Sequence, residues 1–288
     1  MIEFLVTSSV LIAAVMILRF LFRGKISRRL QYALWIPVLF RLLMPFPLPG
    51  SPFSVMNAVP GESISTQAVS VAPAAVSVPA AGSSPVAAEN AAAASSAGAM
   101  GADGILSLVW LIGAAAAALW IIGTNLAFYR RLRRTRKAFD IPGFKLPVYV
   151  SKSTVSPCLF GFPRAAVYLT PKAADHEINT RYVLAHELCH YRHGDHVWSI
   201  LRGVCLAVYW WNPLVWAAAV LSRADSELAC DEAVIRRIGE ENRLAYGHTL
   251  VDMVAVKAAP SNVLCVATTM ASGKRSIRAR LNTVSLHI

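Results

Sequence analysis

The stretch His186-Glu187-Leu188-Cys189-His190 contains the HExxH pattern, and this pattern decides the fold expected around it. Residues four apart lie on one face of a helix, so the two histidines can bind the same metal ion. Glu187 then lies beside the metal, where it can accept a proton from the attacking water. The pattern therefore predicts a catalytic zinc site on a helix. The alternative is a helix that carries two histidines without a metal.

The composition is typical of an integral membrane protein. Hydrophobic residues make up 56% of the 288 residues and charged residues 15%, compared with about 25% charged residues in soluble proteins. Mean hydropathy is +0.50. The net charge of +12 would suit either nucleic acid or anionic lipid. Because the basic residues gather beside apolar segments and no nucleic-acid-binding signature is present, we expect contact with the lipid bilayer and no direct nucleic-acid binding.

Apolar segments separated by basic clusters predict three membrane-spanning helices. Residues 1–48 are expected to form two of them, from apolar stretches at 4–22 and 30–48, and residues 104–129 are expected to form the third. Each stretch is close to or longer than the roughly 20 apolar residues that cross a bilayer. A signal peptide is the alternative for the first stretch, but no basic residue precedes its apolar run.

The distribution of charge predicts the orientation of these helices. Basic clusters at 23–29 and 130–137 mark the cytoplasmic side, because Lys and Arg collect in cytoplasmic loops. Residues 49–103 contain no Lys or Arg and are rich in Ala, Ser, Pro and Gly, so we expect an external low-complexity loop. Residues 130–288, which include the HExxH stretch, are therefore expected to form a cytoplasmic domain at the inner face of the cell membrane.

A catalytic zinc site needs a third protein ligand besides the two histidines, and two candidates lie downstream. His196 has the spacing from His190 that the longer HExxHxxGxxH pattern requires, but position 193 is His where that pattern has Gly. Glu227 shares the face of a predicted helix with Asp231, which suits a ligand carboxylate beside a group that orients a ligand histidine. The alternative for these two carboxylates is a solvated acidic face, which the local pattern alone would favour.

Residues 203–222 form a further uncharged apolar stretch, which bears on whether Glu227 can meet His186. A single crossing would place the two residues on opposite membrane faces. Two full crossings need about 40 residues, and only the 36 residues from 191 to 226 are available. The sequence Trp210-Trp211-Asn212-Pro213 breaks the stretch, so we predict a helical hairpin that dips into the membrane without crossing it.

The rest of the cytoplasmic region gives weaker signals. Residues 146–150 and 165–170 are expected to be short strands that pack against the helix carrying the HExxH stretch. That helix is expected to begin after Pro171 or near Asn179 and to end at Gly194.

Several other side chains near the motif are assigned roles by residue type alone. Oxyanion stabilisation needs a further hydrogen-bond donor, for which Tyr191, His193 and His248 are candidates. The five cysteines are expected to be reduced thiols. Cys189 and Cys230 are expected to act as small buried side chains rather than as ligands.

Four sequence elements together resemble the BlaR/MecR antirepressor family of membrane zinc peptidases. They are His186-Glu187-x-x-His190, Asp195, Trp211-Asn212-Pro213-Leu214 and Glu227-x-x-Cys230-Asp231-Glu232. The resemblance covers essentially the full chain and implies a zincin-like α+β metalloprotease domain that follows the N-terminal membrane helices. It further implies that His186, His190 and Glu227 bind Zn²⁺ and that Glu187 is the general base. Asp231 and Asp195 would support the ligands.

The resemblance also implies a function: cleavage of a cytoplasmic protein, such as a DNA-binding repressor, that controls antibiotic-resistance genes. Self-association of the chain is left open. Because the sequence ends at Ile288 without a further span or a penicillin-binding domain, β-lactam sensing is not expected of this polypeptide. Two other functions stay open, namely a housekeeping membrane protease of the HtpX or CAAX-processing type and a non-catalytic membrane signalling scaffold.

Overall fold

The computed structural model describes residues 2–22, 24–44, 102–254, 268–269 and 280–281. The chain divides into two compact units, and the candidate site lies within the unit formed by residues 1–45 and 110–288. In the described part the chain is mainly helical with one small sheet. This confirms the mainly helical part of the expected fold class. The predicted external loop lies almost wholly outside the described residues.

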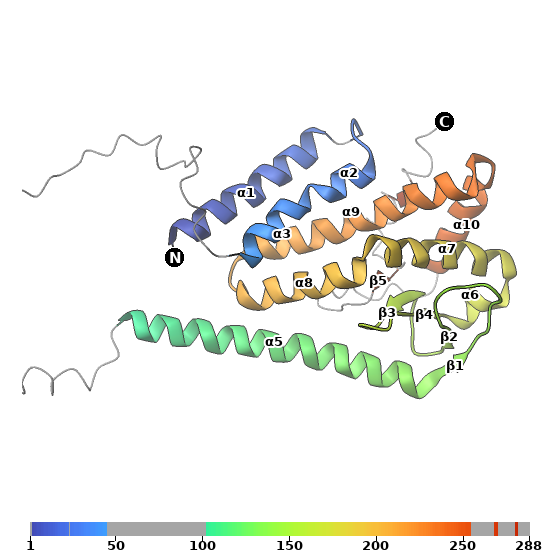
Figure 1. Ribbon diagram of the computed structural model, residues 1–288, viewed down its shortest axis with the longest axis horizontal. Helices are drawn as coiled ribbons and strands as arrows, with labels where there is room; N and C mark the ends of the chain where they lie inside the picture. Colours follow the sequence, from blue (N-terminus) through green and yellow to red (C-terminus); the bar gives the residue numbers. More distant parts are fainter. Residues whose placement is uncertain (1, 23, 45–101, 255–267, 270–279, 282–288) are drawn as a thin grey trace, which may run out of the picture. The chain divides into compact units, whose positions relative to one another are not determined.

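The N-terminal region forms three helices instead of the two that we expected. They are α1 (Ile2–Leu21), α2 (Arg28–Ala33) and α3 (Trp35–Leu43). The expected continuous helix at 30–48 is interrupted at Leu34. Pro37 explains the break, because proline has no N–H to donate to the carbonyl of residue 33 and its ring crowds that carbonyl. Helices α1 and α2 both pack on α9, as Figure 1 shows.

The predicted span at 104–129 corresponds to the long helix α5 (Ala102–Thr135). Its segment from Gly104 to Thr135 is the one helix of the described residues that is long and apolar enough to cross a membrane. The apolar part of α1, Val6–Leu21, is shorter than the roughly 20 residues that cross a bilayer. The number of crossings therefore stays a prediction.

A small five-stranded sheet follows α5, with strand order β1-β2-β4-β3-β5. The two predicted strands correspond to β2 and β4, which are parallel neighbours, whereas β1, β3 and β5 were not predicted and pair antiparallel. The strands are β1 (Arg136–Ala138), β2 (Val148–Ser151), β3 (Cys158–Phe160), β4 (Ala166–Leu169) and β5 (Thr268–Thr269). Leu159 and Val167, both with no exposed surface, pack in the same core cluster as Val183 of the helix that carries the HExxH stretch.

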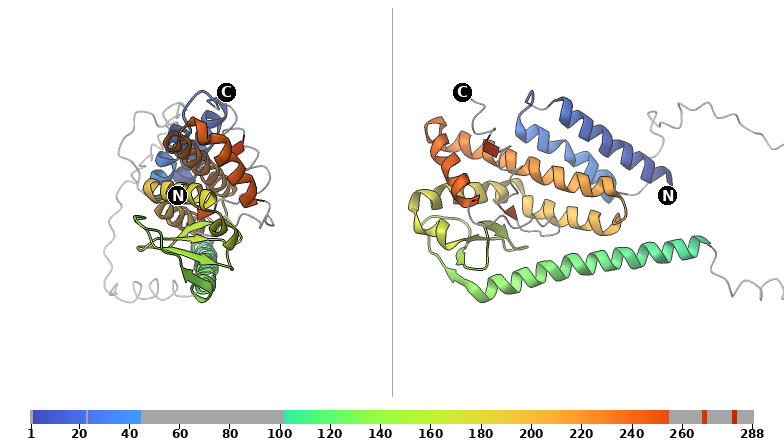
Figure 2. Two further views of the ribbon diagram at one scale, coloured as in Figure 1. Left: turned by 90° about the vertical axis from the view of Figure 1, so that its right-hand side faces the viewer. Right: turned by 180° about the vertical axis from the view of Figure 1, so that it is seen from behind.

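The remaining helices carry the candidate site. They are α6 (Pro171–Asp175), α7 (Glu177–His193), α8 (Asp195–Val208), α9 (Pro213–Ile238), the 3₁₀ turn η2 (Glu240–Asn242) and α10 (Arg243–Val254). Helix α7 ends as expected at Gly194, whose φ of 72° is a left-handed conformation that favours glycine. Figure 2 shows α8 and α9 from behind, running beside each other.

The apolar stretch at 203–222 breaks between α8 and α9, where the sequence predicted a break. The side chain of Asn212 accepts a hydrogen bond from the Leu214 N–H, and Pro213 occupies the first turn of α9. Both helices are longer than the short pair that we expected. Helix α8 already begins at Asp195, and α9 continues through its buried polar residues to Ile238. The polar half of α9 then packs on α7 and brings Glu227 to the HExxH stretch.

Candidate metal centre

Three side chains expected as metal ligands meet between α7 and α9. The Nε2 atoms of His186 and His190 are 3.0 Å apart. The carboxylate of Glu227 lies 3.5 Å from the Nε2 of His186 and 3.7 Å from the Nε2 of His190. A tetrahedral zinc with ligand bonds of about 2.0–2.1 Å holds neighbouring ligand atoms about 3.3 Å apart. The three donor groups are therefore spaced as one zinc ion requires, and all three are buried.

Glu187 supports the same interpretation, because its carboxylate is buried without a partner. The residue has no exposed surface, and among the described residues neither of its carboxylate oxygens has a hydrogen-bond partner. Burial raises the pKa of Glu187 to about 7. Leaving a carboxylate unpaired in the interior is costly unless another group, such as a cation or substrate, interacts with it. The donor set and this orphaned carboxylate fit a bound metal ion.

Asp195 orients His190, one of the two histidines. Its Oδ2 atom lies 2.6 Å from the Nδ1 of His190, and both residues are fully buried. A histidine that donates its Nδ1–H to a carboxylate presents the lone pair of Nε2 to a metal. The hydroxyl of Tyr32, in the N-terminal helix α2, donates to the other oxygen of Asp195 at 2.7 Å.

Asp231 and Tyr246 contact the other histidine, His186. The Nδ1 of His186 lies 2.9 Å from the Tyr246 hydroxyl and 3.3 Å from Asp231, and the Tyr246 hydroxyl donates to Asp231 at 2.7 Å. Burial lowers the pKa of His186, but its hydrogen bonds to Asp231 and Glu227 outweigh burial and raise that pKa to about 10. Without a metal, His186 is therefore a cation in this site at neutral pH.

Arg280 is a buried residue of the site that sequence reasoning did not assign. Its guanidinium donates to both oxygens of Asp231 at 2.7 Å and lies 3.1 Å from Glu227. Burial alone would raise the pKa of Asp231, but Arg280 and His186 hold that pKa well below its usual range. No periodicity or spacing in the sequence connects Arg280 to α9.

The other candidate residues lie away from the three ligands. His196 stacks on Tyr191 with ring centroids 5.6 Å apart, so His196 does not join the site as a third ligand. Tyr191 is 40% exposed and His248 is exposed, and their role as oxyanion donors stays a prediction. His193 lies between two thiols instead of beside the ligands, with its Nδ1 3.7 Å from the Sγ of Cys189 and 3.5 Å from that of Cys230.

The cysteines of the described region are buried free thiols. This holds for Cys158, Cys189, Cys205 and Cys230, in agreement with the expectation of reduced cysteines. Cys265 lies outside the described residues. The Sγ of Cys230 also lies 3.3 Å from the Nδ1 of His190, so this small side chain fills the space behind that ligand.

The fold and the site together define a class of protein: a largely helical protein with a candidate metal centre of the HExxH type between two helices. The chain belongs to the peptidase M56 family, since the family model described as BlaR1 peptidase M56 matches residues 1–284. This confirms the family resemblance drawn from the motifs.

Two named relatives agree with the family assignment. The chain is 27% identical over 205 residues to the Regulatory protein BlaR1 of Bacillus licheniformis, covering 63% of this chain and 33% of that protein. It is 22% identical over 116 residues to the Methicillin resistance mecR1 protein of Staphylococcus aureus, covering 39% of this chain and 20% of that protein. The chain thus spans a third or less of the length of these relatives.

Proposed function

We propose that this chain is a membrane-bound zinc metalloendopeptidase that hydrolyses a peptide bond in a cytoplasmic protein, such as a transcriptional repressor. One observation carries the proposal: His186, His190 and Glu227 converge with zinc-ligand spacing beside the orphaned carboxylate of Glu187. Two histidines and a glutamate with an open position are a known ligand set of catalytic zinc sites.

The residues around the proposed zinc have distinct roles. When bound, zinc supplies Lewis-acid chemistry that polarises the scissile carbonyl and acidifies the attacking water. Glu187 accepts the proton from that water and returns it to the leaving amine. In the metal-free chain burial raises the pKa of Glu187 to about 7, which makes its carboxylate a stronger base than an exposed one. Asp195 and the pair Asp231–Tyr246 hold the two histidines in the orientation that zinc requires.

The membrane setting supports a substrate on the cytoplasmic side. Helix α5 has no charged residue from 104 to 129 and ends in the basic cluster at 130–137, which the positive-inside rule assigns to the cytoplasm. The catalytic region follows directly, and the hairpin of α8 and α9 enters the membrane beside α5, where the indole N–H of Trp110 donates to the carbonyl of Val208 at 3.0 Å. The relatives named as a regulatory protein and a resistance protein favour a regulatory substrate over general protein turnover.

Glu187→Gln tests the proposal. The full-length chain, purified in detergent, should retain about one zinc per chain in this variant but lose peptide-bond cleavage, because the amide cannot accept the proton. His186→Ala should lose both zinc and cleavage. Glu241→Gln, which alters a carboxylate of the η2 turn outside the site, is the matched control and should resemble the wild type.

Cleavage is measured with a casein substrate, by mass spectrometry of the products. Normal cleavage by Glu187→Gln would refute the assigned base. A wild-type chain that binds no zinc and cleaves no substrate would instead favour the signalling scaffold.

A further inference from the structure

The N-terminal helices reach the candidate metal centre through one side chain. Tyr32, in α2, donates its hydroxyl to Asp195, which lies 163 residues further along the chain. The other oxygen of Asp195 holds the Nδ1 of His190 at 2.6 Å. Two successive hydrogen bonds therefore connect a helix of the N-terminal region to an expected zinc ligand.

Several further contacts fix the helix that carries Tyr32. Its ring packs against Trp198 of α8, with centroids 5.9 Å apart. Asp225, in α9, accepts hydrogen bonds from Arg19 at 2.7 Å, from Trp35 at 2.8 Å and from Gln31 at 3.0 Å. Asp225 lies two residues before the expected ligand Glu227 and is only 1% exposed. The N-terminal helices thus contact α8, which carries the orienting Asp195, and α9, which carries the expected ligand Glu227.

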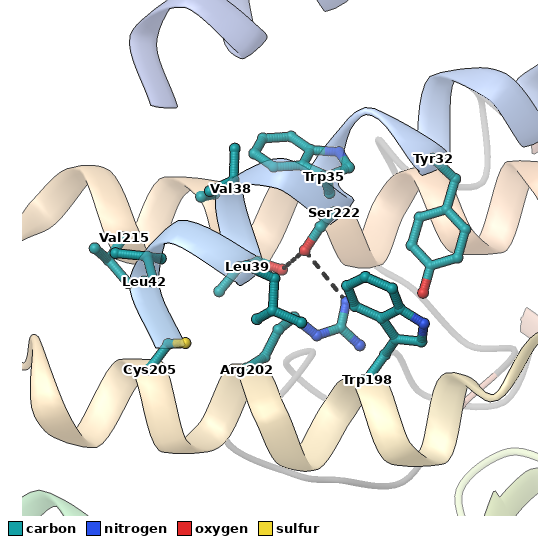
Figure 3. A pocket seen from close by; sticks show the side chains of 12 residues that line it. Tyr32, Trp35, Val38, Leu39, Leu42, Trp198, Arg202, Cys205, Val215 and Ser222 are labelled. Carbon is teal, nitrogen blue, oxygen red and sulfur yellow. Dashed lines mark hydrogen bonds between the residues drawn. The ribbon is translucent and has the colours of Figure 1, made fainter. Parts of the chain in front are cut away.

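The packing beside Tyr32 is incomplete. A cavity of about 30 Å³ lies between α2–α3 and α8–α9, with the side chains of Tyr32, Trp198 and Arg202 on its wall (Figure 3). Arg202 donates to Ser199 at 2.9 Å and to Ser222 at 3.3 Å, so its charged end bonds to α8 and α9. Close packing normally fixes the position of one helix against another. Beside this cavity, the hydroxyl of Tyr32 is a polar contact from the N-terminal helices to Asp195.

We propose that Tyr32 is a positioning residue of the metal centre, and that the metal centre is complete only when the N-terminal helices are docked on α8 and α9. This inference rests on the proposed zinc site. A carboxylate that orients a ligand histidine must itself be held, because each free rotation of Asp195 loosens the Nδ1 contact that fixes the ring of His190. Tyr32 occupies the second oxygen of Asp195 and so limits that rotation. A shift of the N-terminal helices would then weaken metal binding without displacing the helices that carry the three ligands.

Tyr32→Phe tests this role, because it removes the hydroxyl and keeps the ring beside Trp198. Cobalt is the probe ion, and its affinity for the full-length chain is measured by competition with a chromophoric chelator. We expect about a tenfold loss of affinity, the lower end of the range for groups that support metal ligands, together with a changed visible spectrum of the bound cobalt. The matched control is Tyr209→Phe. Its hydroxyl also connects α8 to the N-terminal helices, by donating to the carbonyl of Leu42 at 3.0 Å, but it does not contact the site.

A double-mutant cycle separates positioning from general destabilisation. If Tyr32 acts through Asp195, adding Tyr32→Phe to Asp195→Ala should change cobalt affinity less than twofold. The inference is overturned if Tyr32→Phe binds cobalt as tightly as Tyr209→Phe, or if it costs as much in the Asp195→Ala background as in the wild type. These results leave the proposed function intact. Failure of the wild-type chain to bind any metal would instead refute the proposed function, and this inference would fall with it.

Discussion

Replacing Arg280 by methionine removes the cation that pairs with two buried carboxylates and keeps a side chain of similar length. The guanidinium contacts Asp231 through two hydrogen bonds of 2.7 Å and lies 3.1 Å from Glu227. Arg280 and Glu227 are both 2% exposed, and Asp231 is fully buried. The variant therefore leaves two carboxylates in the interior without their strongest partner.

The structure indicates how large the loss should be. Removing one partner of a buried ion pair typically destabilises a protein by about 3–5 kcal/mol. Asp231 keeps its contacts with Tyr246 and His186, so we expect a value near the lower end, about 3 kcal/mol, for the metal-free chain. At roughly 2–4 °C per kcal/mol for a chain of this size, that loss lowers the midpoint of thermal unfolding by about 10 °C.

Zinc should reduce this loss, because a bound cation neutralises Glu227 in both proteins. Thermal unfolding of the wild type and of Arg280→Met is followed by circular dichroism in detergent, with a chelator and then with excess zinc. The difference between the two midpoints should be larger with the chelator. Arg236→Met is the control: this arginine is 65% exposed and pairs with Glu232 on the same helix, so its loss should cost about 0.5 kcal/mol or less. The reasoning fails if Arg280→Met is no less stable than Arg236→Met, or if zinc leaves the gap unchanged.

Three other predictions concern charge and packing. The pKa of His186 is raised to about 10 in the metal-free site, so zinc must displace a proton from it at neutral pH. The apparent affinity of the chain for zinc should therefore rise with pH across the neutral range. A chelator-competition titration in which the affinity is flat or falls with pH would contradict this. Asp225→Ala leaves the buried donors of Gln31 and Trp35 without their acceptor and should destabilise the chain by about 2–4 kcal/mol, measured by thermal unfolding against the exposed Glu241→Ala. A Cβ added at Gly113 would collide with the ring of Trp210, so Gly113→Leu should lower the unfolding midpoint, whereas Gly123→Leu, with open space at that position, should not. Equal midpoints for the two leucine variants would show that α5 does not approach Trp210.

The parts of the site that could be predicted from the sequence all carry a local signal. The spacing of His186 and His190 follows from the helical repeat, and Gly194 marks the end of the same helix. The break at Trp210–Pro213 follows from the position of a proline in an apolar stretch. The helix of Glu227 and Asp231 could also be predicted, although the choice between a ligand and a solvated face needed the family resemblance. In each case the residues that matter are separated by one or two turns.

The residues that could not be predicted act across long distances in sequence. Arg280 lies 49 residues from Asp231, and Tyr32 lies 163 residues from Asp195. Both contacts depend on how separate helices pack, and no periodicity encodes that. The interruption of the second N-terminal segment had a local signal in Pro37, but the apolar composition of the whole stretch outweighed it. The strands β1, β3 and β5 have two or three residues each, which is too short for an alternating pattern to appear.

The buried charges connect these observations to one physical requirement. Glu187, Glu227, Asp231 and Asp195 are all buried around the HExxH histidines, and Arg280 brings one permanent positive charge to Glu227 and Asp231. Carboxylates in a low-dielectric interior need compensating charge, and without it they take up protons. Protonation of His186 and the raised pKa of Glu187 are both responses to this deficit in the metal-free chain. A divalent cation at the Nε2 atoms would supply the missing charge and displace the proton of His186. It would also give the Glu187 carboxylate the partner that it lacks. The electrostatics of the side chains therefore favour the same occupant as the geometry of the ligands.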